Sequence, residues 1–146
     1  MRVKLLRALL VYCSLCSTVG IHPAEGRESL VAAARSYLGT NPTGWHRDWC
    51  AHFLDLILRQ TGHRGGGNLA LKYLNYGHRV WGPQVGAIAV MGRRGRAKGG
   101  SPGGHVGVVT AVDANGNPVI ISGNHDHHVG IGTYPKGRII AYILPD

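Results

Sequence analysis

The sequence lacks several features that would place it in other classes of protein. No apolar run reaches the roughly 20 residues that a membrane-spanning helix needs, and no polar stretch is long enough for a disordered domain. It shows no internal repeat. Acidic residues are also few, with 7 Asp and Glu against 16 Lys and Arg in 146 residues. These absences leave a single folded domain with its own core.

The excess of basic residues gives a net charge of +9 with histidine neutral, which favours an anionic partner. The basic, glycine-rich loop at 92–104 either binds phosphates and anionic glycans or is simply exposed to solvent. Aromatic residues do not alternate with its basic ones, as they do in proteins that bind single-stranded nucleic acid. The charge suits an anionic cell-envelope polymer, a nucleic acid or a phospholipid surface, and of these we expect the first, with no nucleic acid, no stable membrane span, and a monomer.

The N-terminal segment is typical of a secretory signal. Arg2, Lys4 and Arg7 precede an apolar run at 8–16, and small residues follow. We expect residues 1–24 to be removed, with no single cleavage site indicated, and residues 25–146 to form one domain that is secreted or periplasmic. The alternative is an amphipathic anchor that is not cleaved.

Cysteine is scarce, and this scarcity makes Cys50 conspicuous. Cys13 and Cys16 lie within the predicted signal, so Cys50 would be the one thiol of the mature chain. A lone cysteine in an oxidising compartment cannot form an internal disulfide. It is an intermolecular link, a free thiol kept for its reactivity, or a buried inert thiol.

Helical patterns come first along the chain and strand patterns follow. They predict helices at 27–39, 48–62 and 68–77, and strands at 86–91, 105–112, 118–124, 129–134 and 138–144. Asn115-Gly116 predicts a hairpin between the second and third strands. This order is typical of an α+β fold in which N-terminal helices pack on a C-terminal antiparallel β-sheet.

The position of Cys50 suits a nucleophile. Asp48 is a candidate N-cap of the second helix, which puts Cys50 in its first turn. Unpaired N–H groups and the positive end of the helix dipole favour a thiolate there, and they could also receive an oxyanion. Trp49 beside the thiol could line a substrate groove, and a core position is the alternative.

A thiol nucleophile needs a base, and His105 stands out among nine histidines because it begins an apolar strand after a glycine-rich loop. If the hairpin loop has two residues, the even-numbered residues of strand 118–124 share a face with His105. Asn124 then lies opposite it or one diagonal step away. Its amide oxygen could orient one ring nitrogen and leave the other for the thiol. Asp126 and Ser122 have the same parity and are the competing orienting residues.

The cluster from His125 to His128 suggests a metal site at first sight. Adjacent residues of a strand point to opposite faces, however, and zinc prefers spaced ligands. We therefore interpret the cluster as a polar loop beside the active site, with Asp126 in the substrate cleft, and expect no metal or other cofactor. A metal-dependent hydrolase that uses this cluster is the alternative.

Several short motifs resemble a known family. "DWCAHF" at a helix start, "GHVGVV" opening a strand and "IISGN" on the next strand look like the papain-like cell-wall hydrolases called cysteine, histidine-dependent amidohydrolase/peptidase (CHAP) domains. "LALKYLNYG" followed by "GPQVGAIAVM" is similar to the segment between their helices and first strand. The resemblance covers roughly residues 28 to 144.

The resemblance implies a papain-like fold and a cysteine amidase or endopeptidase that cleaves amide bonds in peptidoglycan. It implies that Cys50 is the nucleophile, His105 the base and Asn124 the orienting residue. Some relatives carry an acidic residue two positions before that asparagine, where this chain has Ser122. A non-catalytic relative that binds cell wall through the same cleft is the main rival.

Overall fold

The computed structural model describes residues 23–92 and 103–146. The predicted signal, apart from its last two residues, and most of the basic loop 92–104 lie outside the described residues. Within the described ranges, no helix is both long and apolar enough to cross a membrane.

The chain has the predicted α+β fold. The helices are α1 (Pro23–Ser36) and α2 (Cys50–Gln60), with two short 3-10 helices, η1 (Ala70–Asn75) and η2 (Lys136–Arg138). The strands are β1 (His78–Val80), β2 (Ile88–Met91), β3 (His105–Val112), β4 (Pro118–His125), β5 (His128–Thr133) and β6 (Ile139–Leu144).

The six strands form one antiparallel sheet in the order β1-β6-β2-β3-β4-β5. Strands β2 to β5 are the predicted meander, and β6 then returns to pair with β2 and β1. The sequence did not indicate this return. It also did not indicate β1, because a strand of three residues is too short to show a period of two.

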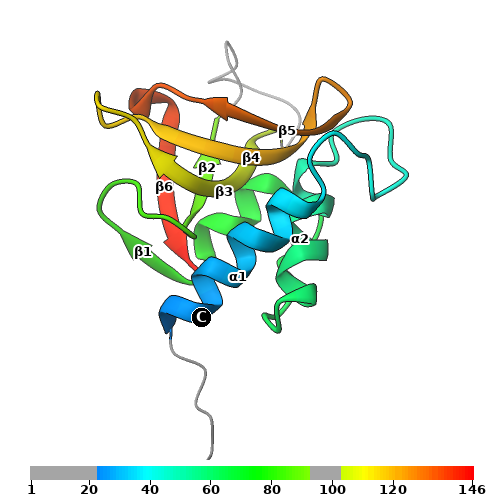
Figure 1. The fold of residues 1–146 in the computed structure, drawn as a ribbon, viewed down its shortest axis with the longest axis horizontal. Coiled ribbons are helices and arrows are strands. Elements are labelled where there is room, and N and C mark those ends of the chain that lie inside the picture. The colour runs from blue at the N-terminus through cyan, green and yellow to red at the C-terminus, as the bar shows by residue number, and fades with distance from the viewer. Residues whose placement is uncertain (1–22, 93–102) are drawn as a thin grey trace, which may run out of the picture.

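Helices cover one face of this sheet, which we call the helix face (Figure 1). The buried residues of α2 are at positions 50, 51, 53, 54, 57 and 58, the spacing of a helix with one apolar side. They join α1, η1 and inward residues of the strands in the larger hydrophobic cluster. The other side of the sheet, which we call the second face, carries a smaller cluster of Ala87, Ala89, Met91, Val109, Ile120 and Tyr142.

The loop between β3 and β4 is at the predicted place but is longer than predicted. Val112 pairs with Pro118, so residues 113–117 form a loop of five residues. The carboxylate of Asp113 accepts the N–H group of Asn115 at 2.9 Å, and Gly116 supplies a φ of 78°. A side-chain turn of this kind is what Asp and Gly favour at hairpin ends.

A β-bulge corrects the effect of the longer loop. The five-residue loop by itself would put odd-numbered residues of β4 on the same face as His105. The register shifts by one between Val109 and Ala111, so that Val108 pairs with Ile121 further along. At the far end of the hairpin, the even-numbered residues of β4 therefore share a face with His105 as predicted, although the two-residue loop assumed in that prediction is wrong.

Candidate active site

Cys50 is the first residue of α2, so its predicted place at a helix N-terminus is confirmed. Trp49 occupies the N-cap position without a side-chain hydrogen bond, and Asp48 before it has a φ of 52°. The prediction that Asp48 caps the helix is wrong, because the helix begins at Cys50 with Trp49 as its N-cap.

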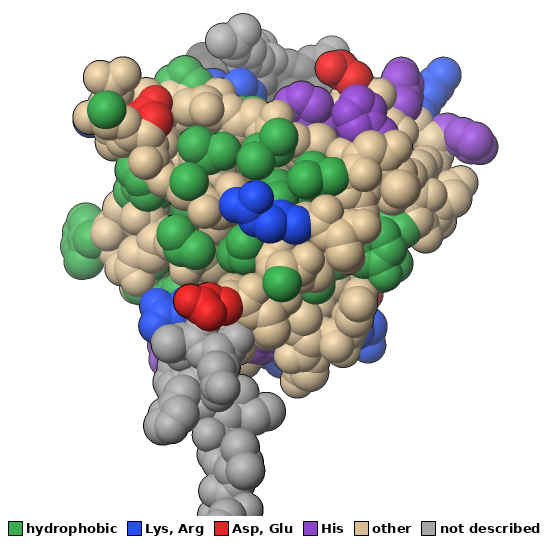
Figure 2. Space-filling view, in the orientation of Figure 1, with side chains coloured by type: hydrophobic (Ala, Val, Ile, Leu, Met, Phe, Trp, Pro, Cys, Tyr) green, Lys and Arg blue, Asp and Glu red, His purple; other side chains and the backbone are tan. Residues whose placement is uncertain are grey.

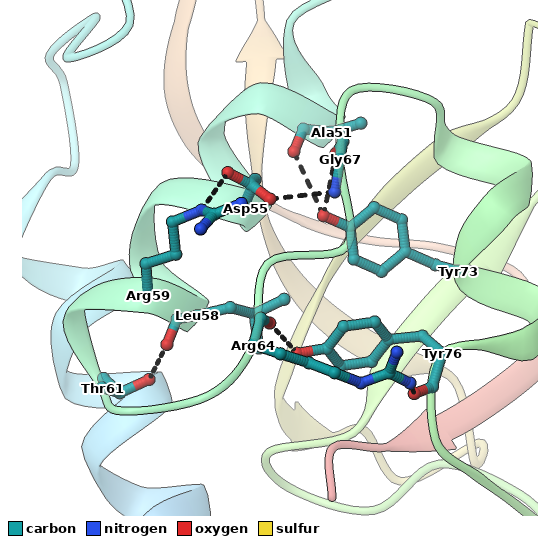
Figure 3. A network of polar contacts seen from close by, with 9 residues as sticks. All are labelled: Ala51, Asp55, Leu58, Arg59, Thr61, Arg64, Gly67, Tyr73 and Tyr76. Carbon is teal, nitrogen blue, oxygen red and sulfur yellow. Dashed lines mark hydrogen bonds and ion pairs between the residues drawn. The ribbon is translucent and has the colours of Figure 1, made fainter.

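A network of polar contacts holds the first turn of α2 against the loop that follows the helix (Figure 3). The hydroxyl of Tyr73 lies 3.1 Å from the carbonyl oxygen of Gly67 and 3.4 Å from that of Ala51. The carboxylate of Asp55, one turn along α2, accepts the N–H group of Gly67 at 2.9 Å. Because Ala51 follows the thiol directly, this network fixes the turn that carries Cys50.

Cys50 is only 6% exposed, and burial raises the pKa of its thiol above the ordinary value. Hydrogen bonds from backbone N–H groups, those of Val106, Ala51 and Cys50 itself, act in the opposite direction, and the negative charge of Asp48 adds to the increase. The N–H groups at the helix start therefore do lower this pKa, but the prediction of a net lowering is wrong. Desolvation outweighs the N–H groups, and the resting group is a neutral thiol.

His105 begins β3 as predicted and lies on the second face, where it pairs with Met91. Its Nε2 atom lies 2.9 Å from the hydroxyl oxygen of Ser122. Gly107 makes room for this contact, since a Cβ atom there would lie 2.8 Å from the Cβ atom of Ser122. On its other side the His105 ring centroid lies 6.0 Å from that of Tyr134. Of the three residues with the predicted parity, Ser122 is the one bonded to the ring.

The imidazole of His105 is neutral at pH 7. Burial lowers its pKa to about 4, and the positive charges of His125 and Arg138 act in the same direction. Since Nε2 is turned toward Ser122, Nδ1 is the ring nitrogen that remains to accept a proton.

The thiol and the imidazole reach the site from opposite faces of the sheet. Cys50 belongs to the cluster on the helix face, and His105 lies on the second face. The β3–β4 pairing extends only as far as Val108 opposite Ile121, so residues 105–107 have no paired residue on β4 in the described chain. The two strands therefore separate where His105 begins β3.

The N-terminus of α2 packs on β4 at Gly123. The backbone N–H group of Val106 lies close enough to Cys50 to lower the pKa of its thiol, and a Cβ atom on Gly123 of β4 would lie 2.7 Å from the ring of Trp49. The thiol therefore lies beside the residue that follows His105. Among the described residues, no hydrogen bond joins the Cys50 and His105 side chains directly.

A cavity of about 340 Å³ opens beside His105, and its lining is His105, Asn124, His125, Asp126, Tyr134 and Arg138. Asn124 and Asp126 thus lie in one cavity with His105. Their φ angles are 56° and 52°, which breaks the alternation of side chains along β4. Left-handed backbone at non-glycine residues is costly and is concentrated at functional sites. Asn124 lines the cavity, and its predicted role in orienting His105 stays a prediction.

The histidine cluster lies around the turn between β4 and β5. Figure 2 shows histidine side chains gathered at the end of the molecule where Figure 1 has this turn. The rings of His125 and His128 are 6.2 Å apart, and the Nδ1 atom of His128 bonds to the carbonyl oxygen of Asp126. In the part of the chain that the structure describes, no three His, Cys, Asp or Glu side chains are placed to share a metal ion. This geometry favours a polar turn.

Trp49 is fully buried, so it packs in the core and does not line the cleft, contrary to the hypothesis drawn from its position beside Cys50. Two residues of the cavity, Tyr134 and Arg138, were not predicted. Neither residue belongs to a motif, and their closeness to His105 depends on the register of β5 against β4, which shifts between Ser122 and His125.

Comparison with known proteins gives one clear result. No curated protein matches the sequence significantly. The family model of the CHAP domain matches residues 42–124, which is more than half of the chain and runs from the loop before α2 to the end of β4. Members of this family are in general amidohydrolases or peptidases that act on cell-wall peptidoglycan. Together with the motifs that surround the thiol and the imidazole, this match shows that the chain belongs to the CHAP domain family.

Proposed function

We propose that this protein is a secreted cysteine hydrolase that cleaves amide bonds in peptidoglycan, as an amidase or endopeptidase, with Cys50 as nucleophile and His105 as base. One observation carries the proposal. The backbone of Val106 acts on the pKa of the thiol at the start of α2, and the residue before Val106 is a histidine whose Nε2 atom lies 2.9 Å from the hydroxyl oxygen of Ser122.

The mechanism begins from a neutral pair. As the sulfur of Cys50 attacks the amide carbonyl carbon, its proton passes to Nδ1 of His105. Unpaired N–H groups at the start of α2 stabilise the oxyanion. His105 then gives the proton to the leaving amine, and a water molecule hydrolyses the thioester. Hydrogen bonds between catalytic groups often tighten only when substrate binds, so the thiol and ring need not be bonded beforehand.

Two residues share the support of His105 in this proposal. Ser122 holds Nε2, and Asn124 is the third member of the proposed Cys-His-Asn set because it lines the same cavity. A hydroxyl group stabilises an imidazolium less than a carboxylate does. The serine therefore fits a site in which His105 rests as a neutral base.

The export part of the proposal rests on residues 1–24 acting as a signal and 25–146 as the mature domain. Helix α1 begins at Pro23, close to the proposed junction. The mass of the protein recovered from culture medium or periplasm measures the cleavage position directly.

The test of the proposal is the substitution Cys50→Ala. It should abolish the release of soluble fragments from purified peptidoglycan, since no other group can form the thioester. The matched control is Thr61→Ala at the opposite end of α2, whose hydroxyl bonds only to carbonyl groups of its own helix. That control should lose some stability and keep its activity. Mass spectrometry of the fragments identifies the bond that is cut, and full activity in Cys50→Ala would rule out the proposal.

A non-catalytic protein that binds cell wall is the second candidate. The raised pKa of the Cys50 thiol favours it, because a neutral thiol is a poor nucleophile without help from a base. This candidate requires that the unaltered protein sediment with peptidoglycan and release nothing from it, and that Cys50→Ala bind equally well.

A further inference from the structure

The cavity beside His105 contains a cation that the proposed mechanism does not use. The guanidinium carbon of Arg138 lies 5.5 Å from the ring centroid of Tyr134, and the same tyrosine ring lies 6.0 Å from that of His105. The hydroxyl of Tyr134 is 3.4 Å from Nδ1 of His125. Tyr134 thus connects the proposed base to two basic side chains in the wall of one cavity.

Arg138 has no ion-pair partner of its own. Within residues 23–92 and 103–146, Arg59 pairs with Asp55 and His78 with Asp146, and no ion pair of Arg138 is formed. The one carboxylate in the cavity lining, that of Asp126, is exposed to solvent. Besides burial, His125 and Arg138 both act to lower the pKa of His105, so both side chains lie near the position where the chemistry would occur.

The cavity is small. Its volume of about 340 Å³ is near the lower limit for ligand pockets in proteins, and it suits one or two residues of a peptide better than a glycan strand. A group bound there lies beside His105, so it would be close in the substrate to the amide that is cleaved. A guanidinium with free donors binds a carboxylate by two parallel hydrogen bonds.

We propose that Arg138, assisted by His125, binds a free carboxylate of the peptide substrate next to the scissile amide, and so makes the protein selective for acidic peptides. This inference rests on the proposed function. Arg138 is here a specificity-determining residue, with no part in proton transfer. The competing explanation is that Arg138 stacks on Tyr134 only to cover the edge of the sheet.

The experiment compares two peptide substrates that differ at one group, a free carboxylate or its primary amide beside the cleaved bond. Arg138→Gln should lower kcat/KM for the acid by about 10- to 100-fold, the typical contribution of a hydrogen-bonded charge, and change that for the amide less than about threefold. Arg138→Lys should recover part of the loss. The matched control is Lys136→Gln on the same short helix, whose ammonium group lies toward Asn115 and away from the cavity. Equal losses on acid and amide, or no loss on either, would overturn the inference.

A binding measurement separates failure of this inference from failure of the proposed function. In a Cys50→Ala background, which cannot turn over, calorimetry measures the affinities for the same acid and amide. The acid should bind more tightly, and adding Arg138→Gln should remove the difference. Equal affinities in the Cys50→Ala protein overturn the role of Arg138. A preference for the acid without any cleavage by the unaltered protein supports Arg138 and counts against the hydrolase.

Discussion

The two faces of the sheet differ in what they contribute. The helix face is closed by α1, α2 and η1 over the larger hydrophobic cluster, and it carries the thiol at its rim. The second face has a small cluster, the His105–Ser122 pair and a cavity that opens to solvent. The helix face thus contributes most of the apolar burial and the second face most of the polar chemistry. The proposed catalytic pair requires both, and it forms only where β3 and β4 separate.

Burial affects the two proposed catalytic groups in the same sense although they lie on different faces. It raises the pKa of the Cys50 thiol and lowers that of the His105 ring, so both groups are neutral at rest. The lesson is that a helix N-terminus next to a histidine does not by itself produce a thiolate–imidazolium pair. The charge state of the thiol and of the imidazole depends on how far each face of the sheet excludes water.

The largest expected effect concerns the second face. An unfolded chain protonates a histidine near pH 6.5, whereas folded His105 resists protonation down to about pH 4. The unfolded state therefore binds more protons between these values, and the free energy of unfolding should fall by about 3 kcal/mol as pH drops from 6.5 to 4. Urea denaturation across this pH range measures the fall.

His105→Gln should flatten that part of the pH dependence, because the group that takes up the proton on unfolding is gone. The surface substitution His127→Gln is the control for loss of an imidazole and should retain the slope of the unaltered protein. If His105→Gln keeps the full slope, burial of the second face is not what holds His105 neutral, and the two faces differ less than the structure indicates.

The second effect concerns the junction of the faces. Gly123→Ala should cost about 1 to 3 kcal/mol in the free energy of unfolding, because the added methyl group meets Trp49 and Phe53 at 2.7 Å. Activity should fall as well, since α2 must move away from β4 and take the thiol with it. The control is Gly137→Ala, where a Cβ atom has nothing within 4 Å. Chemical denaturation of both variants makes the comparison, and equal stabilities would show that the faces are not tightly joined at Gly123.

The smallest effect concerns the support of the base. Ser122→Ala should reduce kcat by about 2- to 10-fold, the equivalent of one neutral hydrogen bond, with little change in KM. The control is Thr110→Val, which removes the hydroxyl group of the other buried serine or threonine of the described chain without touching His105. A kcat unchanged in Ser122→Ala would mean that another residue, with Asn124 the first candidate, orients the ring.

The sequence predicted those parts of the site that depend on local pattern. A helix N-terminus near Cys50 and the strand start at His105 follow from turn residues and periodicity, whereas the face of Ser122 was predicted from a loop length that is wrong. The cap at Asp48 was wrong because the helix begins at Cys50 with Trp49 as its N-cap, and the thiol pKa was wrong because desolvation depends on what packs around Cys50. Tyr134 and Arg138 were not predicted because their contacts depend on pairing across the sheet, including an irregularity between Ser122 and His125.

The irregular β3–β4 hairpin has a consequence for protein engineering. The five-residue loop and the bulge each reverse which side of the sheet β4 presents, and together they cancel. A design could replace the loop with a two-residue turn and keep the bulge, or it could remove the bulge and keep the loop. Either change alone would turn Ser122 away from His105, although every proposed catalytic residue would still be present in the sequence. The loop and the bulge therefore compensate each other, and designs based on this domain need to copy both or replace both.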